Sequence, residues 1–219
     1  MLSNLITFTT ILAVTSALPA GSEVSHSPFE TQHQIANFDN DAGLPALAVA
    51  PIGTANSILF NGMALVQTQS TAKGVPYVDA HSAPNYAAYS KFAVPTLLQG
   101  QPAMSVDYPS SIVDHFDLGG FWYGCAAGSE ESVIGVPLPC TIEIKGYKDS
   151  EGKDLVATQE FDYNIKLGDL NTQMIQAKVD KKFKGLKKVE FFVSDDTYTA
   201  ALIDDVAYTV YVKKQGTHP

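Results

Sequence analysis

Two clusters of acidic residues mark the ends of the β-rich part of the chain. Phe38-Asp39-Asn40-Asp41 stands at its start, and Ile203-Asp204-Asp205-Val206 introduces its last expected strand. Carboxylate and amide oxygens are the ligands that Ca²⁺ takes in proteins. Since the first and last strands of a β-sandwich often lie side by side, the two clusters can meet around a structural Ca²⁺. The alternative is that these acids form turns and protect strand edges.

Aromatic residues are the second set of candidates. The only tryptophan stands in Phe121-Trp122-Tyr123, and three tyrosines stand in segments expected to be loops. Sugar rings stack on exposed Trp and Tyr rings, which have an apolar body and a polar rim. The predicted ligand-binding residues are Tyr77, Tyr86, Tyr89, Trp122 and Tyr123. The alternative for Trp122 is a core position beside a disulfide.

Motifs of several enzyme classes are absent. The chain has no Gly-x-Ser-x-Gly, His-Glu-x-x-His, Gly-x-x-x-x-Gly-Lys or Gly-x-Gly-x-x-Gly motif, and its five histidines are scattered. Paired carboxylates of a glycosidase remain open, because two acids can meet from anywhere in a sandwich. Five acids are close in sequence, and solvated loop positions are the alternative for them: Asp107, Asp114, Asp117, Glu130 and Glu131.

The N-terminal segment predicts secretion. Leu5 to Val14 is an apolar run too short to span a bilayer, and small residues precede a cleavage position after Ala17. No other apolar run reaches 18 residues, so no membrane span is expected. In an oxidising compartment Cys125 and Cys140, the only cysteines, are expected to form one disulfide.

Charge is unevenly distributed over the 219 residues. The formal net charge is −9, and residues 1–143 contain eleven acids against two lysines, whereas residues 144–219 contain twelve of each. All basic residues are lysines, and a chain without arginine lacks the forks that read phosphates and bases. We therefore expect no nucleic-acid partner, and an acidic front part that favours neutral ligands or cations. Solubility alone is the simpler interpretation of this acidity.

The strand pattern predicts an all-β fold. From about residue 58, short runs rich in Val, Ile, Tyr and Phe alternate with clusters of Gly, Pro, Asn and Asp. About ten such runs favour a single-domain β-sandwich of jelly-roll type with one disulfide. Residues 170–184 are the best helix candidate but fit a strand equally well. The expected organisation is a signal peptide (1–17), a flexible lead-in (18–34), a β-sandwich domain (35–213) and a flexible tail (214–219).

Several short segments resemble a family of small secreted fungal proteins of mostly unknown role. They include Phe60-Asn61-Gly62-Met63, Phe116-Asp117-Leu118-Gly119-Gly120-Phe121 and Asp204-Asp205-Val206. The order of the segments is similar to that of galactose-binding-like jelly rolls, the fold of many carbohydrate-binding modules. The resemblance implies a Ca²⁺ site near Asp39, Asp41 and Asp205. It does not define a ligand, and this chain lacks a cluster of tryptophans.

These patterns predict a secreted, extracellular, non-catalytic protein that binds a glycan or a cell-wall component. The first alternative is a secreted interaction protein, either a host-directed effector or a structural wall component, with a protein ligand. The second is a glycan-active enzyme that uses paired carboxylates. The sequence leaves the oligomeric state open.

Overall fold

The strands follow from the alternation of apolar and polar residues. In the last strand, Val206, Tyr208 and Val210 are buried, while Ala207 and Thr209 between them are half-buried. The computed structural model describes residues 27–45, 47–68, 77–166, 170–194 and 198–214. Over these residues the chain forms one helix, α1 (Val94–Gln99), and the following strands: β1 (Phe29–Ala36), β2 (Leu44–Pro45), β3 (Pro51–Ala55), β4 (Ile58–Gln67), β5 (Tyr77–Asp79), β6 (Asn85–Tyr89), β7 (Ala103–Ser105), β8 (Val113–Gly128), β9 (Val133–Pro137), β10 (Cys140–Tyr147), β11 (Leu155–Tyr163), β12 (Asn171–Gln173), β13 (Ile175–Lys178), β14 (Lys188–Val193) and β15 (Thr199–Lys213).

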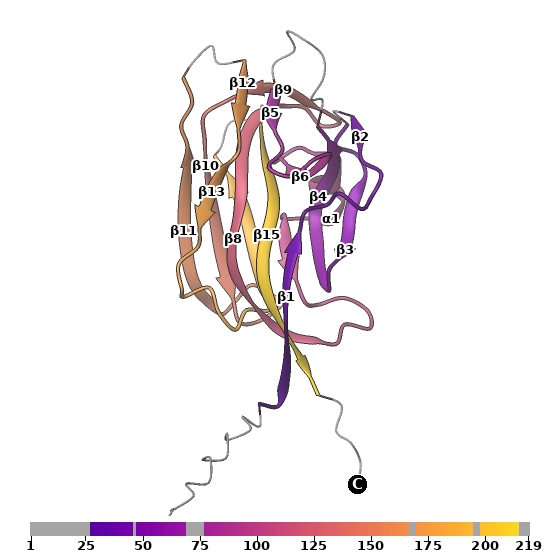
Figure 1. Cartoon of the computed structure of the whole chain (residues 1–219), viewed down its shortest axis with the longest axis vertical. Coiled ribbons are helices and arrows are strands. Elements are labelled where there is room, and N and C mark those ends of the chain that lie inside the picture. Colours follow the sequence, from indigo (N-terminus) through magenta and orange to yellow (C-terminus); the bar gives the residue numbers. More distant parts are fainter. Residues whose placement is uncertain (1–26, 46, 69–76, 167–169, 195–197, 215–219) are drawn as a thin grey trace, which may run out of the picture.

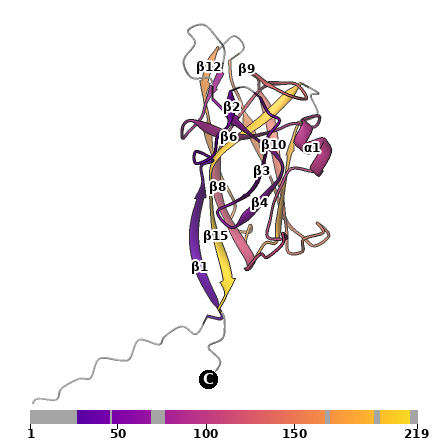
Figure 2. The ribbon, with the colours of Figure 1, turned by 90° about the vertical axis from the view of Figure 1, so that its right-hand side faces the viewer.

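Nearly all strands belong to one curled sheet. Its central path runs β11-β10-β14-β7-β4-β6-β15-β8-β13, while β1 pairs with β15, β9 with β8, and β2 and β3 with β4. The curl places β1, β8 and β15 in one layer, and β10 and α1 on the other side of the molecule (Figures 1 and 2). The predicted all-β sandwich of jelly-roll type is confirmed.

The main core fills the space between the two layers. Its largest fully buried side chains are aromatic and aliphatic, and they come from both halves of the sheet: Phe60, Phe116, Phe121, Phe191 and Ile142. Each such side chain stabilises the fold by roughly 1.5–3 kcal/mol relative to leaving it in water. This burial fixes which side of β8 and β15 faces inward.

A second, smaller core covers part of the side of β8 and β15 that faces away from the main core. We call the side of β1, β15 and β8 that faces away from the main core the outer face. Val78 of β5 and Leu202 of β15 are buried together there. A Cβ atom on Gly124 would lie 2.7 Å from Val78 Cγ1, so glycine at this position lets β5 lie close to β8. The upper half of the outer face is thus covered.

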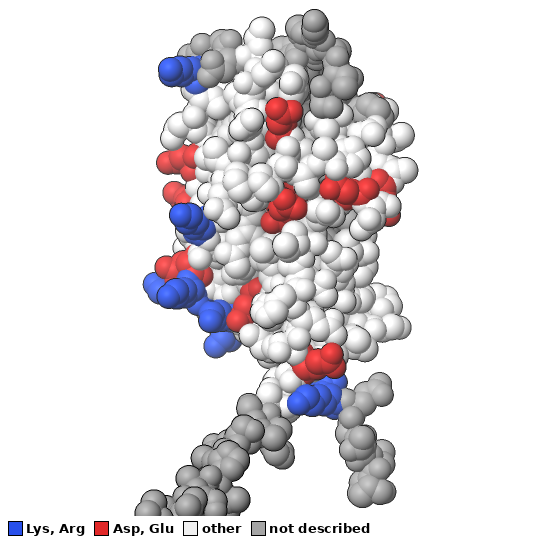
Figure 3. Space-filling view, in the orientation of Figure 1, with Lys and Arg blue, Asp and Glu red and all other residues white. Residues whose placement is uncertain are grey.

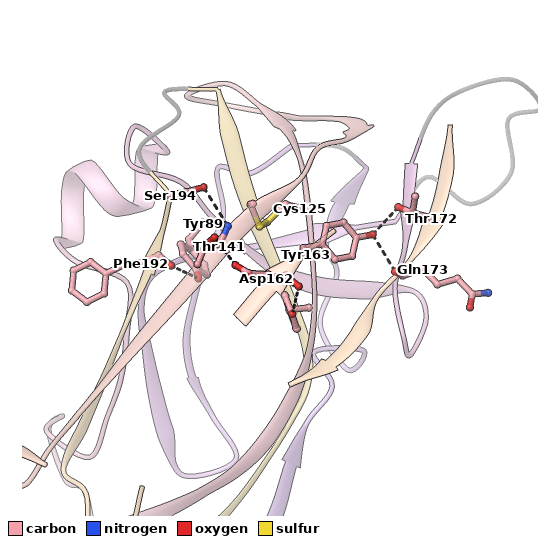
Figure 4. The surroundings of a disulfide bond; sticks show 11 residues. Tyr89, Cys125, Thr141, Asp162, Tyr163, Thr172, Gln173, Phe192 and Ser194 are labelled. Carbon is pink, nitrogen blue, oxygen red and sulfur yellow. Dashed lines mark hydrogen bonds between the residues drawn. A yellow bond between two sulfur atoms is a disulfide. The ribbon is translucent and has the colours of Figure 1, made fainter. Parts of the chain in front are cut away.

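The predicted disulfide is confirmed, and it joins the two layers. Cys125 lies on β8 and Cys140 on β10, with their Cα atoms 6.1 Å apart. Figure 4 shows Tyr163 beside it, whose hydroxyl donates a hydrogen bond of 2.8 Å to Thr172 Oγ1. The bridge therefore holds the upper part of the sandwich closed beneath β12.

Two expectations about local structure need correction. Residues 29–34, expected to belong to a flexible lead-in, are part of β1, because each of them pairs with a residue of β15. The helix candidate at residues 170–184 contains β12 and β13, and the only helix of the described ranges, α1, begins with Val94-Pro95. The predicted signal peptide and cleavage position lie outside the described residues, as does nearly all of the predicted tail. Among the described residues, no helix has the length and apolar character needed to cross a membrane.

Removing the disulfide should destabilise the fold without changing it. The Cys125→Ser/Cys140→Ser variant loses a cross-link that closes a loop of 15 residues, which the chain-entropy relation values at about 3 kcal/mol of unfolding free energy. Urea unfolding followed by the fluorescence of Trp122 measures this loss. Equal midpoints for the oxidised wild type and the double variant would contradict the prediction.

Candidate functional site

The outer face is open where the cover of the second core ends, and this border contains the only tryptophan. Trp122 of β8 lies opposite Asp204 of β15 on one side and opposite Gln176 of β13 on the other. Paired residues of antiparallel strands project to the same face, so these three side chains form one row across the sheet. Trp122 is half-buried and packs against the second core, whereas Gln176 is exposed.

His81 stacks on the Trp122 ring. The two ring centroids are 3.6 Å apart and the ring planes differ by 12°. His81 Nδ1 lies 2.5 Å from Asp205 Oδ2, so the carboxylate fixes the orientation of the imidazole. His81 itself is exposed. The stack therefore presents an aromatic surface with a carboxylate at its rim.

Asp204 attaches the segment that carries His81 to the sheet. The backbone N–H and the hydroxyl of Ser82 donate hydrogen bonds of 2.7 Å and 3.1 Å to its carboxylate, and the N–H of Asp205 donates a third of 2.7 Å. The Asp204 side chain is completely buried. Burial raises the pKa of this carboxyl from its ordinary value to about 7, although the three hydrogen bonds favour the charged form.

The segment that carries His81 and Ser82 also contacts the Asp39 cluster, through Asn85. The backbone N–H of Asn85 donates to Asp39 Oδ1 at 3.0 Å, and its side-chain amide donates to the carbonyl oxygens of Phe38 and Asp41 at 2.9 Å and 2.7 Å. Asn85 Oδ1 is buried and has no hydrogen-bond partner. The segment 82–85 thus contacts both acidic clusters.

The fit of this region to Ca²⁺ is mixed. Within the described ranges, no three His, Cys, Asp or Glu side chains are grouped in a way that could hold a metal ion. Asp205 pairs with His81, and Asp39 accepts a backbone hydrogen bond. The unpaired oxygen of Asn85 is the feature that suits a hard cation, because Ca²⁺ also takes amide and carbonyl oxygens.

Three predicted platform residues are buried, which corrects the expectation that they bind a ligand with their rings. Tyr86 and Tyr89 lie on β6, every residue of which is buried because β6 is a central strand with a core on each side. Tyr123 lies in the main core, and its hydroxyl donates to the carbonyl of Asp162 at 2.9 Å. Burial raises the pKa of Tyr123 to about 12. Of the predicted five, only Tyr77 and Trp122 are partly exposed.

Sequence reasoning missed His81, Ser82 and Gln176. The stack joins His81, which lies between β5 and β6, to Trp122 of β8. No local sequence pattern predicts a contact between residues so far apart in the chain. The Ser82–Asp204 hydrogen bonds likewise join residues far apart in the chain. The Asp204-Asp205 pair was visible in the sequence, but its role as the anchor of residues 81–82 was not.

Of the acids considered for a glycosidase, Asp107 and Asp114 lie close together. Asp107 and Asp114 line a hollow of about 800 Å³ together with Lys187 and Lys213. Hydrogen bonds from Lys213 and His115 lower the pKa of Asp114, whereas a glycosidase acid needs a raised pKa. Asp114 is therefore unsuited to protonate a leaving group.

The buried Asp204 should make stability depend on pH near neutrality. Between the unfolded pKa near 3.9 and the folded value of about 7, the folded state keeps a proton that the unfolded chain releases. The contribution of this group to the free energy of unfolding therefore falls as the pH rises through this window. Melting temperatures between pH 5.5 and 8 should decrease more steeply for the wild type than for Asp204→Asn. Asp107→Asn, which changes an exposed acid, is the matched control, and parallel slopes for all three proteins would contradict the prediction.

Comparisons with known proteins show only distant similarity. No family model matches the chain, and no curated protein matches it. Among solved structures, a DUF4465 family protein from Bacteroides caccae is 12% identical with a TM-score of 0.45, over 88% of this chain and 97% of that chain. The K2 cleaved adhesin domain of Lys-gingipain is 12% identical with a TM-score of 0.41, over 82% and 99% of the two chains. The C-terminal family 22 carbohydrate-binding module of Clostridium thermocellum Xyn10B is 12% identical with a TM-score of 0.35, over 81% and 92%.

Proposed function

We propose that the protein is a secreted, non-catalytic glycan-binding protein whose ligand contacts the His81–Trp122 stack. The stack itself carries the proposal, because it places aromatic surface at an open position of the sheet. The C–H faces of sugar rings pack on such surfaces, while their hydroxyl groups need polar partners at the rim. Asp205 and Gln176 supply carboxylate and amide groups on either side of Trp122.

The chemistry around the stack favours a neutral sugar. Asp204 and Asp205 are adjacent to it, and the chain has no arginine to pair with a sugar carboxylate or sulfate. The carboxylate of Asp205 accepts hydrogen bonds and repels anions. The disulfide supports an oxidising, extracellular compartment, which agrees with the predicted signal peptide.

A protein partner is the second candidate, and one observation favours it. Leu97 and Leu98 of α1 are 59% and 80% exposed, on the side of the molecule opposite β8 (Figure 2). Exposed apolar side chains that adjoin each other are typical of interaction surfaces. If the Leu97→Ser/Leu98→Ser variant loses binding to a protein partner and the Trp122→Ala variant keeps it, this candidate is favoured.

Trp122→Ala should abolish most glycan binding. Loss of the ring removes the surface on which His81 and the sugar pack, and the affinity should fall about tenfold or more. Isothermal titration with neutral oligosaccharides selected on a glycan array measures it. Phe192→Ala, which removes a half-buried ring from the other half of the sheet, is the matched control. Absence of binding of the wild type to every glycan on the array would contradict the proposed function.

We also propose that Ca²⁺ binds at the loop of Asp39 and Asp41 with Asn85 Oδ1 as a further ligand, while the third predicted carboxylate, Asp205, is held by His81. The unpaired Asn85 Oδ1 supports this site, since a cation would supply the partner that it lacks. Adding EDTA should then lower the melting temperature, and Ca²⁺ in excess over the chelator should restore it. An Asp41→Asn variant should lose the response to EDTA. Equal melting temperatures of the wild type with and without chelator would contradict the proposal.

A further inference from the structure

A second stacked pair lies lower on the same outer face. The rings of His115 and Tyr211 have centroids 4.3 Å apart and planes that differ by 14°. His115 Nδ1 lies 2.9 Å from Asp114 Oδ2, and the Tyr211 hydroxyl donates to Asp117 Oδ2 at 3.1 Å. Phe29 of β1 packs edge-on against His115 at 5.1 Å.

This second pair repeats the chemistry of the first. In each pair an imidazole lies flat on a larger aromatic ring, and a carboxylate holds its Nδ1 atom. In each pair β8 and β15 supply the principal groups: Trp122 and Asp205 above, and His115 and Tyr211 below. Among the hydrogen bonds of the described residues, none uses the remaining nitrogen, Nε2, of either imidazole.

The two pairs are separated by the length of a short chain of sugars. Trp122 and His115 are seven positions apart on β8, which corresponds to about 23 Å at a rise of about 3.3 Å per residue. A disaccharide is much shorter than this distance. A linear chain of several sugar rings can reach from one pair to the other.

The sheet between the two stacked pairs carries small side chains on its outer face. Gly120 lies opposite Ala207, and Gly119 precedes it, so small residues form the floor. A Cβ atom on Gly119 would lie only 3.2 Å from the carbonyl oxygen of Ala207. A hollow of about 550 Å³ lies over this floor, and Asp117, Thr209, Lys181 and Lys184 are among the residues that line it.

The charges along this path are mixed. Figure 3 shows the same face with lysines gathered on one side and at the lower end, acidic residues scattered between, and much of the middle uncharged. A neutral chain with many hydroxyl groups suits such a surface better than a polyanion, which Asp205 and Asp117 would repel.

We propose that the two stacked pairs are the ends of one groove, and that this groove binds a neutral linear glycan lying parallel to β15. The inference rests on the proposed function, because it takes the His81–Trp122 stack as one of the sugar contacts. It adds the class of ligand, an extended chain, and names Tyr211 and His115 as the second contact.

The test compares long and short ligands. The probes are neutral linear hexasaccharides of β-1,4-linked glucose, xylose, mannose and N-acetylglucosamine and of β-1,3-linked glucose, each with its disaccharide. Titration calorimetry of the wild type should identify at least one hexasaccharide that binds, and its affinity should be at least tenfold higher than that of the corresponding disaccharide. Tyr211→Ala should lower hexasaccharide affinity about tenfold and leave disaccharide affinity within a factor of two. Trp122→Ala should weaken both.

Two further variants separate the ring from the fold. Tyr211→Phe keeps the ring and loses only the hydrogen bond to Asp117, so it should retain hexasaccharide binding. Ala207→Leu raises the floor between the pairs and should weaken only the hexasaccharide. Equal affinities for the two ligand lengths, or a Tyr211→Ala protein with unchanged melting temperature and unchanged hexasaccharide affinity, would overturn this inference and leave the proposed function standing. No binding of any probe to the wild type would overturn this inference, and no binding to any glycan on the array would overturn the proposed function as well.

Discussion

The pairing of β8 with β15 is the interaction on which the rest of the structure depends. Its register extends from Val113 opposite Val212 to Ala127 opposite Thr199, and other strands join the free edges of this pair: β1 and β6 on β15, and β9 and β13 on β8. The register is interrupted near Asp205, whose φ of 44° lies in the left-handed region. This irregularity lets Asp204 project to the outer face while Val206, two residues later, is buried in the main core. This register determines the positions of both stacked pairs.

The upper site exists because the outer face is only partly covered. Apolar contacts of Val78 and Leu202 attach β5 to the outer face. The hydrogen bonds between Ser82 and Asp204 fix the border of the covered part. Asp204 is thus a structural residue that positions His81 for its contact with Trp122. A carboxyl with a pKa of about 7 in this position links the stability of the border to pH. Packing, hydrogen bonding and exposure of the aromatic surface are therefore coupled at one place.

The sequence predicted most of the strands and the disulfide, because both depend on local or unique features. Strand β4 follows a run of mostly apolar residues, β11 ends in an alternation of polar and aromatic residues, and two cysteines allow only one pairing. It was wrong about Tyr86 and Tyr89, since the burial of β6 comes from segments far away in the chain that cover its two sides. It was right that the ends of the fold lie side by side, because β1 pairs with β15 along its whole length. It could not reveal the stacked histidines, because each stack joins side chains from segments that meet only after the sheet has formed.

The pairing of β1 with β15 also determines how the molecule responds to mechanical force. Phe29 lies opposite Lys213, so the two ends of the described chain leave the body at the same point (Figure 1). A tension that pulls these two ends apart acts on the first pair of hydrogen bonds before it acts on the next. The strands therefore unzip one residue pair at a time, and no large group of hydrogen bonds shares the load. The same two strands resist far better when the load runs along their axis, since all of their hydrogen bonds must then break together. An attachment through both ends would make β1 a weak link, whereas an attachment through one end leaves the sandwich unloaded.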